Sequence, residues 1–338
     1  MHHQMRLFAA AAIAAALLAG PASAQQSVAD FYKGKTIVIL MGTGPGGSYD
    51  LYGRVIAEHM SRHIPGNPNI IIEHMPGAGG VIAGNHLYGP GPQDGSKILL
   101  SHAIPLSEKL QPKGVRFQSA KFHWLGTYDA IAHTMAFWHT APVKTIADLK
   151  KGNLIVGSFA KVHLTYQWPA MLRDVLGLNF KVITGYPTGN TNNLAMERGE
   201  IHGWAASWEN LIGTRPHWIT EKKVTLLAQF TLERKPQIPD VPTLLELAPA
   251  EKKDVVEFLT AATPFGRAMA VGPGVPKDRV AALRKAFLDT FRDPAFLAAA
   301  KKRKLDIDAH DWRYAHALVN KIANASPELI ARVQKSIQ

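Results

Sequence analysis

The 338-residue sequence contains no cysteine, which excludes disulfide bonds and thiolate metal sites, so its stability has to come from packing. It also lacks an apolar run long enough to span a membrane, because the longest candidate, Leu7 to Ala19, is too short. Acidic residues are few, 26 against 38 basic ones, and the formal net charge is +12. The basic residues are dispersed and are not interleaved with aromatic ones, so we expect no nucleic-acid binding and favour small anions as partners.

The first 24 residues have the pattern of a secretory signal peptide. Arg6 precedes the short apolar run, and Ala22-Ser23-Ala24 forms the A-x-A exit before Gln25. We therefore expect export to the periplasm and cleavage after Ala24. A twin-arginine pair is missing, so the chain is expected to cross the membrane unfolded and without a cofactor.

The rest of the chain is organised around a strand, a glycine-rich loop and a helix. Residues 36–41 are β-branched and apolar, residues 42–49 are rich in glycine, and apolar residues recur at helical spacing from Leu51 to His63. Ser48 is a suitable N-cap for this helix. Free amides and the positive end of the helix dipole then meet at one point, which predicts a site for an anion.

The same loop also matches a dinucleotide fingerprint, Gly42-x-Gly44-x-x-Gly47, and the acid Glu73 ends the next strand. One alternative is therefore an exported oxidoreductase that binds a dinucleotide there. Another is a purely structural turn, because glycine-rich turns between strand and helix are common without a ligand. The loop alone does not decide between these alternatives.

Alternating strands and helices predict an α/β fold of two lobes, each a mostly parallel sheet flanked by helices. The alternation of predicted strands and helices is interrupted near residue 126, where two strands follow one another without a helix. It is interrupted again at the proline-rich segment after residue 232. We therefore predict a first lobe from residues 25–125 and 232–338 and a second lobe from 126–231. Loops at the carboxyl ends of the strands should line a ligand cleft between the lobes.

Other chemistry finds little support in the sequence. His59 and His63 have the i, i+4 spacing of a metal pair, but a third ligand is not evident. Ser158 has His163 nearby, but no acid is evidently placed to orient the histidine. We expect no metal, no cofactor and no catalysis.

The chain resembles the substrate-binding proteins of tripartite tricarboxylate transporters, the Bug receptor family. The landmarks that carry this resemblance, in order, are Gly44-Pro-Gly-Gly-Ser-x-Asp50, Pro76-Gly-Ala-Gly79, Pro92-x-Asp-Gly95, Ile238-Pro-Asp-Val-Pro-Thr-Leu-x-Glu246 and Pro273-x-Val-Pro276. The resemblance implies a type II periplasmic-binding-protein fold that closes on a small organic carboxylate. It also implies delivery to a membrane transporter with one small and one large integral subunit. The chain itself is expected to be a monomer, and a sensing role instead of uptake stays open.

The resemblance also implies how a carboxylate is held, by main-chain amides of residues 44–49 in one lobe and 158–163 in the other. The chain departs from the family pattern at Phe159 and Lys161, which would change the size and charge of the pocket, and at His202. With the other strand-end loops, the predicted ligand-binding residues are Gly44, Pro45, Gly46, Gly47, Ser48, Tyr49, Ser101, His102, Ser158, Phe159, Ala160, Lys161, His163, Thr165, Tyr186, Thr188, Trp204 and Ser207.

Aromatic residues lie on or beside several of these loops. Tyr49, Phe159, Tyr186, Trp204 and Trp208 could form walls for an aromatic or apolar ligand, or could fill the lobe cores instead. Asp50 is expected to order the first turn of the helix that follows the glycine loop, with binding of a ligand amine as the alternative.

Overall fold

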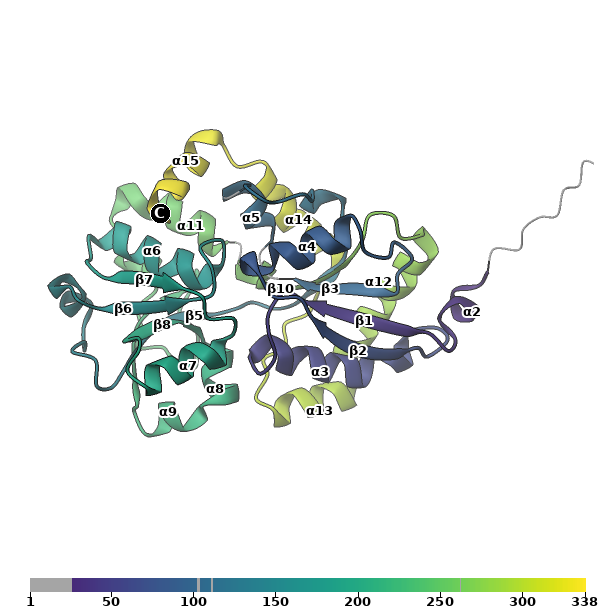
Figure 1. The fold of residues 1–338 in the computed structure, drawn as a ribbon, viewed down its shortest axis with the longest axis horizontal. Helices are drawn as coiled ribbons and strands as arrows, with labels where there is room; N and C mark the ends of the chain where they lie inside the picture. Colours follow the sequence, from purple (N-terminus) through teal and green to yellow (C-terminus); the bar gives the residue numbers. More distant parts are fainter. Residues whose placement is uncertain (1–25, 102–103, 111, 262) are drawn as a thin grey trace, which may run out of the picture.

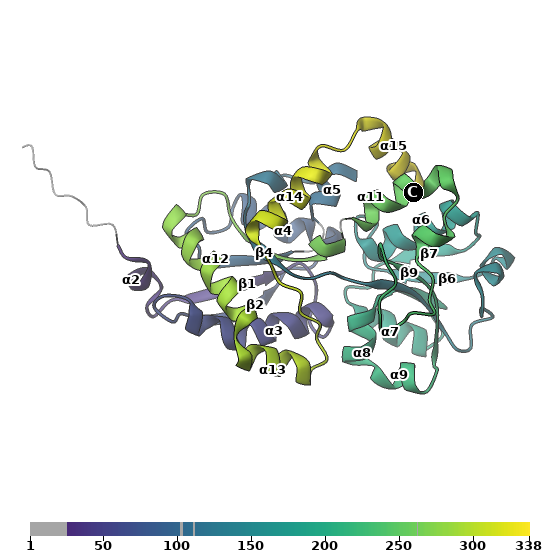
Figure 2. The same cartoon turned by 180° about the vertical axis from the view of Figure 1, so that it is seen from behind.

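The computed structural model describes residues 26–101, 104–110, 112–261 and 263–338, so the predicted signal peptide lies outside the described part. Two bodies, each a sheet covered by helices, lie side by side (Figure 1) and are joined by connections that are visible from behind (Figure 2). Within these residues, a helix long and apolar enough to cross a membrane is not found.

The first lobe is built on a six-stranded sheet with the order β11-β4-β10-β3-β1-β2. Its strands are β1 (Thr36–Met41), β2 (Asn69–His74), β3 (Lys97–Ser101), β4 (His123–Asp129), β10 (Arg267–Val271) and β11 (His310–Asp311). Strand β1 runs parallel to β2 and β3, whereas β10 is antiparallel to β3 and β4, and β11 is antiparallel to β4.

Helices cover both faces of this sheet, as Figure 1 shows. One face packs against α3 (Ser48–Met60), α12 (Lys277–Arg292) and α13 (Pro294–Lys302), with α2 (Val28–Tyr32) at the end. The other face packs against α4 (Val81–Tyr88), α5 (Ile104–Leu110) and α14 (Trp312–Ala323). The apolar stripes of these helices close two separate cores, one on each side of the sheet.

The second lobe is built on a five-stranded sheet with the order β7-β6-β8-β5-β9. Its strands are β5 (His133–Trp138), β6 (Ile155–Ser158), β7 (Lys181–Thr184), β8 (Gly203–Ser207) and β9 (Val224–Phe230). Helix α6 (Leu164–Leu176) covers one face, and α7 (Gly189–Glu197), α8 (Trp208–Thr214) and α9 (Pro216–Thr220) cover the other. The predicted two-lobe α/β fold is confirmed, with mixed sheets because each lobe adds antiparallel strands to a parallel core.

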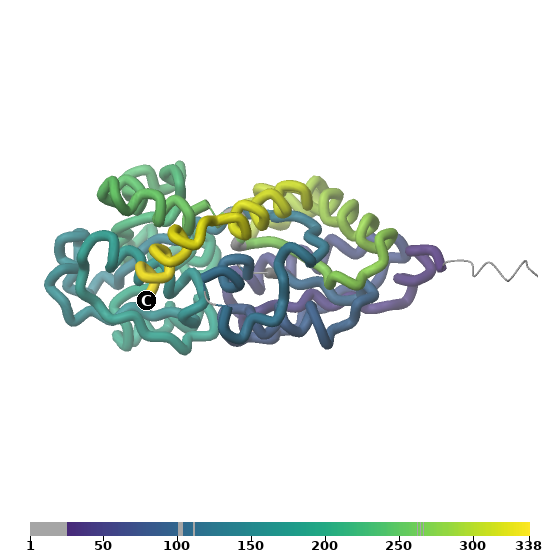
Figure 3. Tube along the Cα trace, turned by 90° about the horizontal axis from the view of Figure 1, so that it is seen from above, coloured from purple at the N-terminus to yellow at the C-terminus, as the bar shows by residue number. Residues whose placement is uncertain are grey.

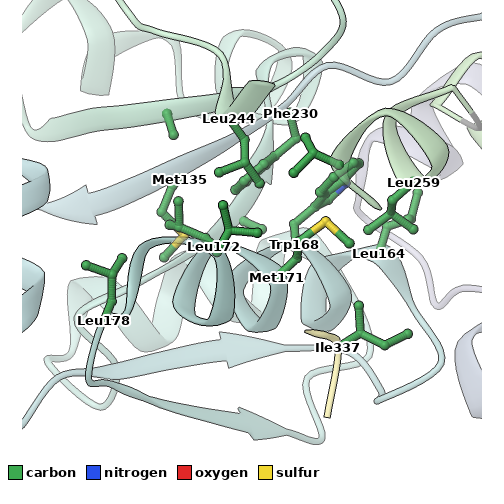
Figure 4. Close-up of a cluster of buried hydrophobic side chains, with 14 of the residues drawn as sticks. Met135, Leu164, Trp168, Met171, Leu172, Leu178, Phe230, Leu244, Leu259 and Ile337 are labelled. Atoms are coloured by element: carbon green, nitrogen blue, oxygen red, sulfur yellow. The ribbon is translucent and has the colours of Figure 1, made fainter. Parts of the chain in front are cut away.

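The main core of the second lobe explains why its boundaries differ from the sequence prediction. Trp168 of α6 stacks on Phe230 of β9, with ring centroids 4.8 Å apart. Leu259 and Ile337 lie on the same core (Figure 4), although both fall in the range 232–338 that was assigned to the first lobe. Leu259 belongs to α11 (Lys253–Thr260), and Ile337 directly follows α15 (Pro327–Ser336).

The chain therefore does not return to the first lobe near residue 232. The proline-rich segment folds back along β9, where the Gln229 side chain donates to the carbonyl oxygens of Ile238 and Val241 at 3.3 and 2.6 Å. It leads into α10 (Leu244–Leu247) and then α11, whose apolar faces bury against the second lobe. The return lies between the end of α11 at Thr260 and the start of β10 at Arg267.

A third connection joins the lobes at the C-terminus. Helix α14 packs on β4 of the first lobe, whereas α15 packs on α6 and α11 of the second lobe and also on α5 of the first. Figure 3 shows this segment running over both lobes from above. We propose that the lobes comprise residues 26–129 with 263–323, and residues 133–260 with 327–338.

Candidate functional site

A cavity lies between the lobes, at the carboxyl ends of β1 and β6. Its lining consists of Thr43, Gly44, Gly47, Ser48, Tyr49, Ile131, His133, Phe159, His163, Thr165, Thr188, Gly189, Trp204, Ser207 and Asn210. Among these described residues there is no lysine, arginine, aspartate or glutamate. The site therefore offers neutral hydrogen-bonding groups and aromatic surface.

Four helices begin at this cavity. Their N-cap residues, Gly47 of α3, His163 of α6, Thr188 of α7 and Ser207 of α8, all belong to its lining. Because the N-terminus of a helix carries a partial positive charge and exposed amides, four such ends together favour an anion. This arrangement joins one helix of the first lobe with three of the second.

The four N-termini are not equivalent. In the second lobe, His163 Nδ1 accepts from the Thr165 amide, Thr188 Oγ1 from the Thr191 amide and Ser207 Oγ from the Asn210 amide, each at 3.1 Å. Gly47 has no side chain to cap α3. The α3 N-terminus therefore keeps amides that no N-cap side chain occupies.

Asp50 stabilises the glycine loop that leads into α3. Its Oδ2 accepts from the Gly46 amide at 3.0 Å and from Arg54 Nε at 3.0 Å, and its side chain is nearly buried. The carbonyl oxygen of Thr43, on the other side of the loop, contacts His74 Nδ1 at 2.7 Å. Asp50 thus orders the glycine loop that precedes α3.

Histidines in the cavity are neutral. Burial lowers the pKa of His163 to about 3 and the pKa of His133 well below its usual value. Because His163 Nδ1 accepts a hydrogen bond, the single proton of the neutral ring is on Nε2. Burial also raises the pKa of Tyr49, so its phenol is neutral as well.

Several buried polar atoms of the lining have no hydrogen-bond partner among the described residues. They are Thr43 Oγ1, His133 Nδ1 and Asn210 Nδ2. A buried polar group without a partner costs about 1–3 kcal/mol, so native proteins rarely leave three together unless something else satisfies them. These atoms suit a polar ligand.

Aromatic rings line the second-lobe side of the cavity. The Phe159 ring lies 4.5 Å from the His163 ring and 6.1 Å from the Trp204 ring, with the latter pair stacked at 25°. Trp204 Nε1 donates to Asn193 Oδ1 at 3.1 Å, which fixes the indole. Tyr186 lines an adjoining groove instead, and Trp208 faces a different hollow beside α13.

Most residues predicted from the sequence meet at this cavity, but some do not. Those in its lining are Gly44, Gly47, Ser48, Tyr49, Phe159, His163, Thr165, Thr188, Trp204 and Ser207, while Ala160 and Tyr186 line the adjoining groove. Pro45, Gly46 and Lys161 are exposed outside the cavity, and the Ser158 hydroxyl donates to the Ile183 carbonyl oxygen at 2.8 Å. His102 lies outside the described residues, as does the side chain of Ser101.

The sequence prediction missed five residues of the lining. They are Thr43, Ile131, His133, Gly189 and Asn210. Asn210 follows Ser207 by three residues, in the first turn of a helix that starts at the end of a strand. A polar residue at such a position was the signal that could have identified it. Ile131 belongs to the crossing between the lobes, and His133 directly follows that crossing as the first residue of β5. Nothing in the sequence pattern shows that this junction lies beside the cavity.

The two lobes touch around the cavity. A Cβ atom on Gly44 would lie 3.1 Å from Thr188 Cγ2, and one on Gly79 would lie 2.7 Å from Val162 Cγ2. Gly79 also has a φ of 62°, which favours glycine. Both first-lobe glycine loops therefore abut second-lobe loops directly, and the structure is a closed form.

The strand order disfavours the dinucleotide interpretation of the glycine loop. In a dinucleotide-binding half, the first three strands lie in the order 3-2-1, so the second strand lies between the first and the third. Here β1 lies between β2 and β3. In addition, Glu73 pairs with Lys97 Nζ at 3.1 Å on β3. In the described residues no group of three or more His, Cys, Asp or Glu side chains that could hold a metal is found.

Comparison with known proteins gives matches in sequence and in structure, although no protein-family model matches the chain. A UPF0065 protein of Cupriavidus necator is 29% identical over 252 residues, which is 71% of each chain. A second UPF0065 protein, of Pseudomonas sp. strain P51, is 24% identical over 268 residues, 76% of this chain and 75% of the relative.

Solved structures of periplasmic binding proteins have the same fold. BugD superimposes with a TM-score of 0.73 at 20% identity, over 90% of this chain and 98% of its own. MatC of Rhodopseudomonas palustris, solved with bound malate, gives 0.69 at 18% identity, over 90% and 99%. An R. palustris protein solved with adipate gives 0.71 at 16% identity, over 89% and 97%.

BugD is a periplasmic binding protein, and the other two structures contain a dicarboxylate. The resemblance predicted from the sequence is confirmed. The chain has the two-lobe fold of the Bug and TctC periplasmic binding proteins.

Proposed function

We propose that this protein is a periplasmic receptor that captures a small organic carboxylate between its lobes and delivers it to a tripartite tricarboxylate-type membrane transporter. The observation that carries the proposal is the meeting of four helix N-termini, from both lobes, at one cavity whose described lining has no charged side chain. Neutral amides at helix N-termini hold an anion through charge-assisted hydrogen bonds.

The proposed capture begins at the uncapped N-terminus of α3. Its amides would hold one carboxylate, and the second lobe would add neutral polar groups such as Asn210 Nδ2 when it closes. Contacts from both lobes exist together only in the closed form, so a ligand that makes them shifts the population towards closure. Binding needs no bond to be made or broken, in keeping with a receptor and not an enzyme.

The remaining cavity suits a ligand with a second polar group and an apolar body. His133 Nδ1 and Asn210 Nδ2 offer polar partners, and Phe159 and Trp204 offer flat apolar surface. Malate and adipate in the neighbouring structures support a dicarboxylate, and the stacked rings also admit an aromatic acid.

A thermal-shift panel on the chain without its first 24 residues tests this proposal. The panel contains monocarboxylates, dicarboxylates including malate and adipate, aromatic acids, and NAD and NADP. At a hundredfold excess over Kd, a true ligand should stabilise the protein by about 2.7 kcal/mol. Protection by a dinucleotide, with no response to any acid, would instead favour an oxidoreductase.

A further inference from the structure

Arg267 occupies the point where the chain re-enters the first lobe. It is the first residue of β10 and is completely buried. Its Cα partner on the neighbouring strand is Asp129, the last residue of β4, where the chain leaves the first lobe. The Arg267 guanidinium donates to the Asp129 carboxylate, so this buried ion pair joins the two strands at the hinge.

The same guanidinium also reaches the cavity through Ser48. Its Nη2 donates to Ser48 Oγ at 3.1 Å, and Ser48 is the first residue of α3 and part of the cavity lining. A guanidinium can only donate, so the serine oxygen accepts this bond and its own hydrogen has to point elsewhere. A ligand oxygen in the cavity is in a position to take that hydrogen.

Neighbouring side chains hold Arg267 in one orientation. The guanidinium carbon lies 4.1 Å from the centre of the Tyr52 ring and 5.5 Å from that of Tyr49. The Tyr52 hydroxyl donates to Asp129 Oδ2 at 3.0 Å, which also fixes the acid. A lysine has no planar fork that could bind an acid, donate to a serine and stack on a ring at the same time.

Arg267 also meets a charge from the second lobe. Glu209 of α8 is fully buried, and its Oε2 lies 3.8 Å from Arg267 Nη1. The other oxygen of Glu209 lies 3.6 Å from Lys235 Nζ, which in turn binds Asp306 of the first lobe at 2.9 Å. Glu209 follows Ser207, a residue of the cavity lining, by two positions. The charge cluster around Arg267 therefore has members from both lobes.

From this geometry we infer that Arg267 is a positioning residue for the ligand. It keeps the Ser48 hydroxyl turned as a donor towards the cavity, and its contact with Glu209 links that orientation to lobe closure. The inference deepens the proposed receptor function and rests on it. It assigns a buried hinge arginine, outside the cavity lining, to the recognition of an anion.

A double-mutant cycle on ligand affinity tests the inference. Isothermal titration calorimetry with the acid bound most tightly in the panel compares the wild type, Arg267→Lys, Ser48→Ala and the double variant. Each single variant should lose about tenfold in affinity, as expected for one hydrogen bond to a charged ligand. Because both changes remove the same donor, the double variant should lose no more than about tenfold in total.

Arg284→Lys is the matched control. This arginine also stacks on an aromatic ring, 4.0 Å from the centre of Trp312, and donates to the Trp124 carbonyl oxygen at 3.0 Å, but it lies away from the cavity. Its affinity should stay within about twofold of the wild type, because it contacts none of the cavity lining.

The outcomes separate the two proposals. Additive losses in the cycle, or a Ser48→Ala variant that binds like the wild type, would overturn the role of Arg267 while leaving the receptor intact. A Ser48→Ala variant that binds like the wild type would overturn the role even if Arg267→Lys fails to fold. A wild-type protein that binds no acid of the panel would overturn the proposed function, and the inference with it.

Discussion

The helices that begin at the cavity have different N-caps in the two lobes. Helix α3 in the first lobe begins at a glycine, whereas α6, α7 and α8 in the second lobe begin at residues whose side chains already bond their own amides. A capped N-terminus keeps its dipole but offers fewer free amides. We therefore propose that the first lobe binds the carboxylate of the ligand, and that the second lobe mainly sets the shape and the electric field of the cavity.

A side-chain cap on α3 should have the largest effect on binding. At Gly47, φ is −98° and a Cβ atom would meet Gly189 N at 3.7 Å, so a side chain fits there. Gly47→Asp places a carboxylate on the amides that the ligand needs, and we expect affinity to fall about 100-fold, equivalent to about 2.7 kcal/mol. Isothermal titration calorimetry measures the loss.

Gly47→Ala is the control, because it adds the same Cβ atom without an oxygen. It should retain most of the affinity, while Gly47→Asp should unfold at the same or a higher temperature, because an acid stabilises a helix N-terminus. Wild-type affinity in Gly47→Asp would show that the ligand is not held at α3.

Acid should loosen the second lobe through its histidine cap. Burial lowers the pKa of His163 to about 3, against about 6.5 in an unfolded chain. The unfolded state therefore binds more protons between these values, so stability is full above pH 6.5 and falls as pH decreases, by up to about 1.4 kcal/mol per pH unit. His163→Asn keeps a capping oxygen but does not titrate.

Thermal unfolding at pH 4 to 7.5 compares His163→Asn with the wild type. The stability difference between them should shift in favour of His163→Asn as the pH decreases. A difference that is constant over this range would contradict a neutral buried His163.

Removing a second-lobe cap should cost stability more than affinity. Thr188 Oγ1 accepts from the Thr191 amide at the start of α7, so Thr188→Ala should destabilise the protein by about 1 kcal/mol. Denaturant unfolding measures this change, and calorimetry should show a loss of affinity well below that of Gly47→Asp. A loss as large as in Gly47→Asp would place the main grip in the second lobe.

The smallest effect is expected at Lys161. Lys161 is among the ligand-binding residues predicted from the sequence, but it is exposed and lies outside the cavity lining. Lys161→Gln should change affinity by less than about threefold, because an exposed charge is screened by solvent. Calorimetry at low and at high salt measures this, and a tenfold loss at both would restore its predicted role.

The sequence predicted the features that depend on local chemistry. Glycines at 42–47 after an apolar strand mark a strand-to-helix turn by composition alone. It did not predict contacts that depend on where remote segments pack. Leu259 and Ile337 are ordinary apolar residues, and only the shape of the second-lobe core shows that they belong to it.

The burial of charged residues in the core also could not be predicted from the sequence. Arg267, Asp129 and Glu209 lie far apart in the chain, and each reads as a surface residue by type. Their burial follows from the pairing of β4 with β10 and from the approach of α8. Ile131 and His133 line the cavity for a similar reason, because the crossing between the lobes passes beside it.

The most direct test of carboxylate capture at the α3 amides is an amide NMR titration of the 15N-labelled protein. The acid bound most tightly in the panel is added to the chain without its first 24 residues. The amides of residues 47–50 should show the largest shifts, followed by those of the second-lobe helix starts at 164–165 and 189. Unchanged amides at 47–50, with binding registered elsewhere in the molecule, would contradict it.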